Sequence, residues 1–290
     1  MTQAAFPPLI AVDIGNSRIK VGRFAGERDQ AGLPIPSHVL ELSASSFDPA
    51  SLTDSFAAAQ AGTGTTAEWW IASVNRAPTE QLTAWLKERA FDEFDSSKRH
   101  ERGASVGSSE RSGYCLLKHL DLPLAVELPQ PDRVGIDRLL GAVAANQVRA
   151  AGRAAVVVGV GTAITVDLVS PAGAFLGGAI LPGIGISARA MHDFTDRLPL
   201  VTMEELADPP PALGTSTIEA MRSGLYWGAL GAMKELIARL AGSKGALASP
   251  SESREIFLTG GAAPVVAQFL DPGAKLIPHL VLGGIALVAE

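Results

Sequence analysis

The chain has 290 residues, of which 47% are hydrophobic and 19% charged, a composition typical of a globular protein rather than a disordered one. Its formal net charge of −6 and isoelectric point near 5.4 disfavour a nucleic-acid partner or an anionic membrane surface. The single cysteine, Cys115, cannot form an intramolecular disulfide, and neither a signal-peptide pattern nor an apolar run of membrane-spanning length occurs, so we expect a cytoplasmic protein without a membrane partner.

Apolar periodicity predicts four strands and one helix in the first part of the chain. The strands are expected at residues 9–13, 18–24, 38–43 and 68–74, and the helix at 78–91. Residues 92–113 are polar, charged and rich in Ser and Gly, which is typical of an exposed loop.

Strands and helices alternate in the rest of the chain, which predicts an α/β protein with two sheets. Strands are expected at residues 154–160, 163–169, 173–180, 255–259 and 275–277. Helices are expected at residues 137–152, 184–197, 215–241, 262–270 and 279–289.

Two similar strand–turn–strand units begin roughly half a chain apart. The first contains DIGNS at residues 13–17, and the second contains VGVGT at residues 158–162, where no acidic residue precedes the turn. The repetition indicates two similar halves facing each other across a cleft.

The first turn has the residues of a phosphate loop. Gly15 permits a tight turn whose following amides can point at phosphate oxygens, and Asn16 and Ser17 add short side-chain donors. Lys20 adds a charge partner, while Asp13 at a strand end is suited to holding Mg²⁺ through water. An ordinary hairpin turn would also favour Asn and Gly, so this motif alone leaves both interpretations open.

The motif GIDR, residues 135–138, places a carboxylate and an arginine where a helix is expected to begin. Asp137 could act as a general base that removes a proton from a hydroxyl group, with Arg138 binding an acidic group. Aspartate is also a common capping residue at helix starts, so a structural role stays open at this point.

Other glycine-containing segments could approach a nucleotide. Thr162 in the second turn could donate to a terminal phosphate, and FLTGG at residues 257–261 could lie beneath a base or ribose. The sequence lacks G-x-x-x-x-G-K-[ST] and a well-placed G-x-G-x-x-G, which disfavours P-loop and dinucleotide-binding folds.

The order of the motifs is more specific than any one of them. DIGNSRIKVG, GIDR, GTAITVD, GGAILPG, GTSTIEAMRSGLYWG, TGG and LVLGGIAL follow one another from about residue 9 to residue 288. In this order the chain resembles the type III pantothenate kinases of the acetate and sugar kinase, Hsc70 and actin superfamily. The resemblance implies an α/β fold of two ribonuclease-H-like, actin-like halves with a central cleft and mixed sheets flanked by helices. We expect an N-terminal half at residues 1–135, with the first phosphate loop, and a C-terminal half at 136–290, with the second.

The resemblance also implies ATP-dependent phosphorylation of pantothenate to 4'-phosphopantothenate, the first step of coenzyme A biosynthesis. It implies Asp137 as the proton acceptor and a homodimer with the substrate site at the subunit interface. Asp13 would lie near Mg²⁺. The residues implied in ATP binding are Asp13, Ile14, Gly15, Asn16, Ser17, Arg18, Ile19, Lys20 and Thr162. Those implied in pantothenate binding are Leu128, Gly135, Ile136, Asp137, Arg138 and, from the neighbouring subunit, Thr217.

Three positions depart from the family pattern. Gly159 stands where an Asp usually holds a monovalent cation, K⁺ or NH₄⁺, so no such cation is expected at this position. Leu128 stands where a Tyr usually lines the pantothenate pocket, and Ser17 replaces the usual Thr but keeps the hydroxyl. These departures leave two alternatives: an impaired or regulatory member that binds nucleotide or pantothenate, or a related kinase of another small alcohol.

Overall fold

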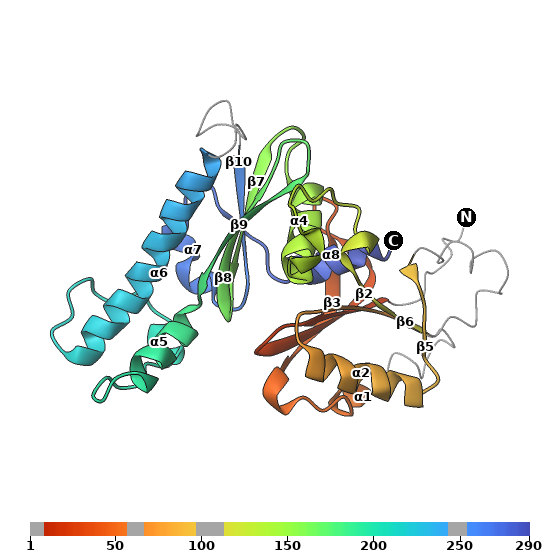
Figure 1. Ribbon diagram of the computed structural model, residues 1–290, viewed down its shortest axis with the longest axis horizontal. Coiled ribbons are helices and arrows are strands. Elements are labelled where there is room, and N and C mark those ends of the chain that lie inside the picture. Colours follow the sequence, from red (N-terminus) through yellow and green to blue (C-terminus); the bar gives the residue numbers. More distant parts are fainter. Residues whose placement is uncertain (1–8, 57–66, 97–112, 243–253) are drawn as a thin grey trace. The chain divides into compact units, whose positions relative to one another are not determined.

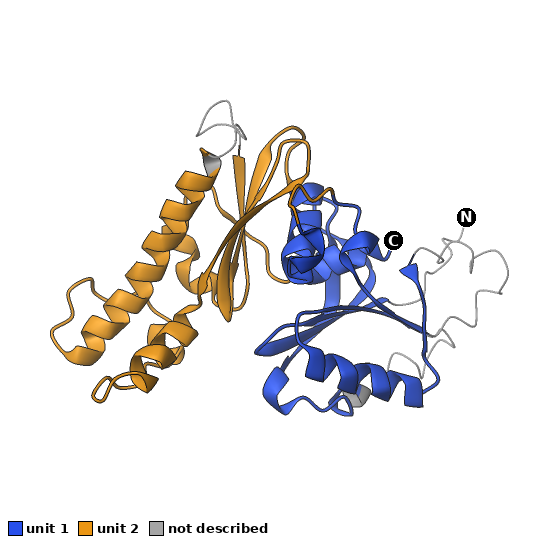
Figure 2. Ribbon diagram, in the orientation of Figure 1, with its two compact units in different colours: residues 1–124, 130–148, 280–290 blue, residues 125–129, 149–279 orange. Residues whose placement is uncertain are grey.

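The computed structural model describes residues 9–56, 67–96, 113–242 and 254–290. Its contacts divide the chain into two compact units (Figure 2). Unit 1 comprises residues 1–124, 130–148 and 280–290, and unit 2 comprises residues 125–129 and 149–279.

Unit 1 contains one mixed sheet with the strand order β3-β2-β1-β4-β6-β5. Its strands are β1 (Leu9–Ile14), β2 (Arg18–Arg28), β3 (Pro34–Ser43), β4 (Glu68–Ser73), β5 (Asp92–Glu93) and β6 (Gly113–Leu116). Strands β1, β2 and β3 are antiparallel neighbours, whereas β4 and β6 continue the sheet in parallel to β1.

Helices cover both faces of this sheet (Figure 1). One face buries alternate apolar residues of β1, β2 and β4 against α1 (Ser51–Phe56) and α2 (Arg76–Glu88). The other face carries α8 (Leu280–Val288), which contacts β1 to β4, and α4 (Ile136–Val148), which contacts β4. Helix α8 is apolar and buried on almost every side, as a helix between a sheet and another helix must be.

The division expected after residue 135 differs from the observed units. Helices α4 and α8 were expected in the C-terminal half, yet both lie in unit 1, where they pack on each other. The physical reason is that the N-terminal sheet has a second face to cover: α8 contacts four of its strands, and α4 packs on α8 and contacts β4.

Unit 2 repeats the same sheet plan. Its strands are β7 (Ala154–Val160), β8 (Ala163–Val169), β9 (Phe175–Pro182), β10 (Arg254–Thr259) and β11 (Lys275–Leu276). The order β9-β8-β7-β10-β11 matches β3-β2-β1-β4-β6, with the same antiparallel and parallel pairings. The expected repeat of two similar halves is therefore visible in the topology, and the predicted α/β class with two mixed sheets flanked by helices is confirmed.

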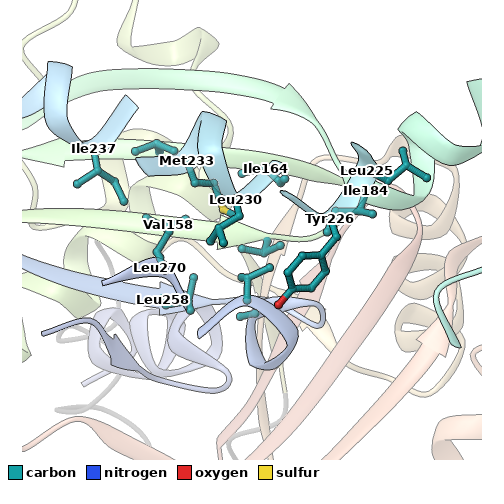
Figure 3. Packing of buried hydrophobic residues seen from close by; sticks show 14 of the residues in the cluster. Val158, Ile164, Ile184, Leu225, Tyr226, Leu230, Met233, Ile237, Leu258 and Leu270 are labelled. Carbon is teal, nitrogen blue, oxygen red and sulfur yellow. The ribbon is translucent and has the colours of Figure 1, made fainter. Parts of the chain in front are cut away.

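The core of unit 2 lies between this sheet and three helices, α5 (Ile184–Asp193), α6 (Thr217–Ala241) and α7 (Ala263–Leu270). Figure 3 shows Leu230 and Met233 of α6 among residues of the strands, including Val158 and Leu258. The hydroxyl group of Tyr226 donates to the carbonyl oxygen of Val265 at 2.7 Å, so even the polar atom of this buried ring has a partner.

Most expected elements are present with ends shifted by a few residues. The predicted helix at 137–152 ends at Val148, and that at 184–197 ends at Asp193. Strand β6 and helix α1 were not predicted, because each is short and lies beside a polar segment. The loop expected at 92–113 falls largely at residues 97–112, outside the described residues.

Two further expectations concern the interior and the membrane. Cys115 is buried in β6, and burial raises the pKa of its thiol to about 12, which suits a small core residue rather than a nucleophile. No helix in the described parts of the chain is long and apolar enough to cross a bilayer.

Glu255 at the start of β10 ties three segments of unit 2 together. Its carboxylate accepts the backbone N–H of Ala150 at 2.7 Å and pairs with Lys275 of β11. Burial alone would raise the pKa of Glu255, but these bonds outweigh burial and lower the pKa below its ordinary value. The ionised Glu255 carboxylate therefore stabilises the folded protein at pH values above its pKa in the unfolded chain, about 4.3. This stabilisation is lost as pH falls through the lower pKa that Glu255 has in the folded protein.

We expect Glu255→Gln to lower the free energy of unfolding at pH 7 by about 1.5–3 kcal/mol, because a charge-assisted bond and an ion pair are lost. Urea denaturation at pH 7 and at pH 3 measures this, and the difference from wild type should shrink at the lower pH. Glu235→Gln, which removes an exposed pair with Arg239, should change stability by less than about 1 kcal/mol. A loss at Glu255 that is equal at both pH values would contradict this account.

Candidate active site

Asp13 lies at the carboxyl end of β1, on the sheet face that α8 covers. It is directly opposite Lys20 of β2 and Ala72 of β4. The neighbouring position on this face, Gly22, would bring a Cβ atom within 3.1 Å of Leu282 of α8, which identifies the face. The carboxylate of Asp13 is thus half-buried, on the α8 face of the sheet and at the end of β1.

The first turn links β1 to β2 through Gly15, Asn16 and Ser17. It is closed by a bond from the N–H of Gly15 to the carbonyl oxygen of Arg18 at 2.9 Å. Asn16, Ser17 and Arg18 are exposed, as a phosphate loop requires. Ile14 and Ile19 are fully buried in the core, so only their backbone groups could contact a nucleotide.

Asn75, which the sequence did not predict, supports this turn from the N-cap of α2, just after β4. Its side-chain amide lies 3.5 Å from the carbonyl oxygens of Gly15 and Asn16, and the N–H of Val74 donates to Ile14 at 3.0 Å. The hydroxyl of Thr79 fixes Asn75 in turn by donating to its carbonyl oxygen at 2.7 Å. A polar residue two positions after a buried strand parallel to β1 was the available signal, since the carboxyl ends of parallel strands meet at one edge.

Asp137 lies in the first turn of α4. A Cβ atom at Gly135 would lie 2.5 Å from Oδ1 of Asp137, so this carboxylate folds back over a position that only glycine leaves open. Ile136 is buried, and the N–H of Arg138 donates to the carbonyl oxygen of Gly135 at 3.1 Å. The four residues of the GIDR motif therefore form one compact helix start.

The pKa values of both carboxylates are raised. Burial raises the pKa of Asp137 and outweighs the backbone N–H groups and the Arg138 charge, which lower it. Burial also raises the pKa of Asp13 from 3.8 to about 7, helped by the negative charge of Asp137 and opposed by Lys20. The two acids, far apart in sequence, thus lie near enough for the charge of one to act on the other.

The Asp13 carboxylate, with the negative charge of Asp137 nearby, fits a divalent cation that is bound partly by water and phosphate oxygens. Two acids that lack full neutralisation by Lys20 attract such an ion, and Mg²⁺ takes few protein ligands. Within the described ranges, no group of three or more His, Cys, Asp and Glu side chains is arranged to hold a metal by itself. The donor set therefore fits a metal that arrives with a ligand.

The second turn, in unit 2, has no charged pair. Gly159 is the topological counterpart of Asp13, and it lies opposite Thr165 of β8 and Thr259 of β10. A Cβ atom at Gly159 would lie 2.8 Å from Oγ1 of Thr165, so the threonine occupies the space of a side chain there. Thr162 stands in the turn itself, closed by a bond from the N–H of Gly161 to Ala163 at 3.0 Å.

The other residues expected to bind substrate also lie in unit 2. Half-buried Leu128 packs over Gly177 of β9, where a Cβ atom would come within 3.2 Å of its side chain. Thr217 is exposed at the start of α6, whose cap is the hydroxyl of Ser216 accepting the N–H of Glu219 at 3.3 Å. The described geometry thus brings together Asp13, Lys20, Asn75 and Asp137 in unit 1.

Comparison with known proteins gives a consistent family signal. A sequence profile described as type III pantothenate kinase matches residues 113–239. The type III pantothenate kinase of Dehalococcoides mccartyi (strain CBDB1) is 30% identical over 292 residues, covering 99% of this chain and 97% of that protein. That of Rubrobacter xylanophilus is 32% identical over 282 residues, covering 97% and 96%. That of Acidiphilium cryptum is 39% identical over 170 residues, covering 59% and 60%.

Solved structures with a similar course of the chain include two proteins of low identity. A glucokinase from an Antarctic psychrotroph matches with a TM-score of 0.48 and 11% identity, covering 97% of this chain and 98% of that one. An archaeal actin homologue matches with a TM-score of 0.42 and 11% identity, covering 97% and 98%.

We expect Asp13→Asn to stabilise the protein at pH 8. Because folding raises the pKa of Asp13 from 3.8 to about 7, the folded state disfavours its ionised form, and wild-type stability falls as pH rises between these values. The variant has no such group, so its gain is largest at pH 8, at most about 4 kcal/mol, and vanishes near pH 4. Thermal unfolding in metal-free buffer across this range measures the gain, with exposed Asp92→Asn as the control. Equal melting temperatures at pH 8 would refute the raised pKa.

Proposed function

The chain belongs to the type III pantothenate kinases, and from this premise we propose that it phosphorylates the primary hydroxyl group of pantothenate with ATP, with Asp137 as the base. The product is 4'-phosphopantothenate, at the first step of coenzyme A biosynthesis. The observation that carries the assignment is the position of Asp137, half-buried at the start of α4, where its charge acts on Asp13 at the phosphate loop.

Asp137 has the properties of a general base. Its raised pKa makes the carboxylate a better proton acceptor than an exposed aspartate, and Gly135 leaves the space that one of its oxygens occupies. As the hydroxyl oxygen bonds to the γ-phosphorus, its proton passes to Asp137. The bond from the γ-phosphorus to the bridging oxygen breaks, and ADP leaves with that oxygen. Arg138 is proposed to bind the carboxylate of pantothenate.

The first turn is proposed to hold the nucleotide. Backbone amides around Gly15, the short side chains of Asn16 and Ser17, and the ammonium group of Lys20 would contact phosphate oxygens. Mg²⁺, bound to ATP and held by Asp13 through water, would neutralise charge on the phosphates. Catalysis then rests on positioning and charge neutralisation, the usual requirements of phosphoryl transfer.

A monovalent cation is proposed to be dispensable. Glycine at position 159 offers no side-chain ligand, and the Oγ1 atom of Thr165 fills the space of one. The roles expected for Thr162, Leu128 and Thr217 stay predictions, as does the cytoplasmic location inferred from the single cysteine.

We further propose a homodimer formed through α6. Ala220, Gly224, Gly228 and Gly231 are exposed at spacings that place them on one face of this helix, where a second helix could approach closely. Thr217 lies on the same face, so a partner seated there would meet the residue expected to reach pantothenate across the interface. Large exposed apolar side chains also recur along the sequence from β9 to the start of α6: Ile180, Ile186, Phe194, Leu200 and Leu213.

We expect Asp137→Asn to lower pantothenate-dependent ADP release by at least about 10²-fold while leaving ATP binding nearly unchanged, because only the proton acceptor is lost. A coupled ADP assay in sodium and then potassium buffer measures turnover, and calorimetry measures binding. Wild type should work equally well in both buffers.

Asp132→Asn is the matched control, since Asp132 is an exposed carboxylate in the segment just before the motif. Full activity of Asp137→Asn would refute the assignment of Asp137 as the general base. Wild type that binds ATP without pantothenate-dependent turnover would refute the kinase, and strong activation by K⁺ would show that another group binds that ion.

We expect Gly228→Arg to convert the dimer to a monomer without unfolding it, because Gly228 is exposed and a Cβ atom added there would meet nothing within 4 Å beyond the nearby backbone of its own helix. Size-exclusion chromatography with light scattering measures the mass, and circular dichroism checks the fold. Ala84→Arg, at an exposed small residue of α2, should stay dimeric. A wild-type monomer, or a dimeric Gly228→Arg, would contradict the α6 interface.

A further inference from the structure

Three charged side chains form a row across the first three strands of unit 1. Asp13 of β1 lies directly opposite Lys20 of β2, and Lys20 lies directly opposite Glu41 of β3. Cross-strand partners point to the same face of a sheet, so the lysine stands between two carboxylates. Glu41 belongs to none of the motifs that the sequence singled out.

Glu41 contacts both cations that flank the phosphate loop. Its Oε1 atom lies 3.7 Å from Nζ of Lys20, and its Oε2 atom lies 3.4 Å from Nη1 of Arg18. The Lys20 side chain is 16% exposed, compared with 39% for Glu41 and 59% for Arg18. The lysine is therefore the enclosed member of the cluster, and Glu41 closes its open side.

Stability does not explain this arrangement well. Ion pairs as exposed as these contribute about 0–1 kcal/mol to folding, since two long side chains lose rotamer freedom in water. A lysine side chain has four rotatable bonds, and its ammonium group can reach many positions unless partners restrict it. Asp13 lies opposite Lys20 on one neighbouring strand and Glu41 contacts its ammonium group from the other, so the lysine has an anion on each side near the end of β1.

We propose that Glu41 is a positioning residue for the nucleotide, holding the Lys20 ammonium group where it meets the phosphates of ATP. This inference rests on the proposed function of the first turn as a phosphate site. Glu41 itself does not touch the nucleotide and acts through Lys20.

The proposal and simple electrostatics predict opposite signs. Glu41 is an anion near a proposed polyanion site, so if it acted only through its charge, Glu41→Gln would tighten ATP binding. If it positions Lys20, Glu41→Gln weakens ATP binding and lowers kcat/KM for ATP. We expect the ATP affinity and the kcat/KM for ATP each to decrease by about fivefold in Glu41→Gln. Glu41→Asp keeps the charge on a shorter side chain, so its values should lie between those of Glu41→Gln and wild type.

A double-mutant cycle with Lys20→Met tests whether the effect passes through the lysine. In that background Glu41→Gln should change the ATP dissociation constant by less than about twofold, whereas in an Arg18→Ala background the fivefold loss should persist. Glu80→Gln on α2, which removes a comparable exposed pair with Arg76 at 2.6 Å, is the matched control and should bind ATP like wild type.

Calorimetric titration of ATP and Mg²⁺ without pantothenate is the deciding measurement, with a thermal melt to confirm that each variant is folded. The proposal is supported if Glu41→Gln weakens ATP binding in the wild-type background but not in the Lys20→Met background. Unchanged or tighter binding, or equal losses in both backgrounds, overturns it. Because the titration needs no pantothenate, wild type that binds ATP but does not phosphorylate pantothenate refutes the proposed function alone, and the binding series still decides the role of Glu41. Wild type that fails to bind ATP overturns both.

Discussion

The contact between α4 and α8 is the constraint on which the candidate site depends. At Gly284 a Cβ atom would lie 2.3 Å from the carbonyl oxygen of Leu140, so only glycine lets the two helices pack this closely. Helix α8 lies on the sheet and α4 lies on α8, which fixes the start of α4 relative to the end of β1. Asp137 is thereby held near Asp13 although no chain segment joins them directly, and burial of both carboxylates raises their pKa values.

The internal repeat explains why the second turn lacks an acid without losing its shape. Register equates Asp13 and Lys20 of unit 1 with Gly159 and Thr165 of unit 2. In unit 1 the opposite charges partly neutralise each other, so a lone glycine opposite Lys20 would leave the ammonium group without that partner. In unit 2 both members are uncharged, and Thr165 fills the space that glycine leaves. The two changes are therefore consistent with each other in size and in charge.

The sequence predicted local features well because they depend on neighbouring residues. Alternation of apolar side chains located the strands around both turns, and the repeat of the turns anticipated the shared topology. It could not predict that the helix at 136–148 packs in unit 1, since that depends on which apolar face stays uncovered. Motif order predicted Asp13, Lys20 and Asp137, whereas Asn75 and Glu41 escaped notice. The contacts of Glu41 arise from strand pairing between distant segments, which the residues around it in the sequence do not show. Asn75 had one signal, a polar residue soon after a buried strand, but its contact with the first turn also joins distant segments.

The place of α8 in the fold has a consequence for how the protein is made. Ribosomal synthesis delivers residues 149–279 before residues 280–290, so almost all of unit 2 emerges while one face of the earlier sheet still lacks its cover. Unit 2 can complete its core first, although its synthesis begins later. Unit 1 is complete only after α8, at the end of the chain, has been made and has packed on the sheet. Such a non-local contact slows folding, and until it forms the uncovered apolar face is open to chaperones and to aggregation. The order of completion is then the reverse of the order of synthesis.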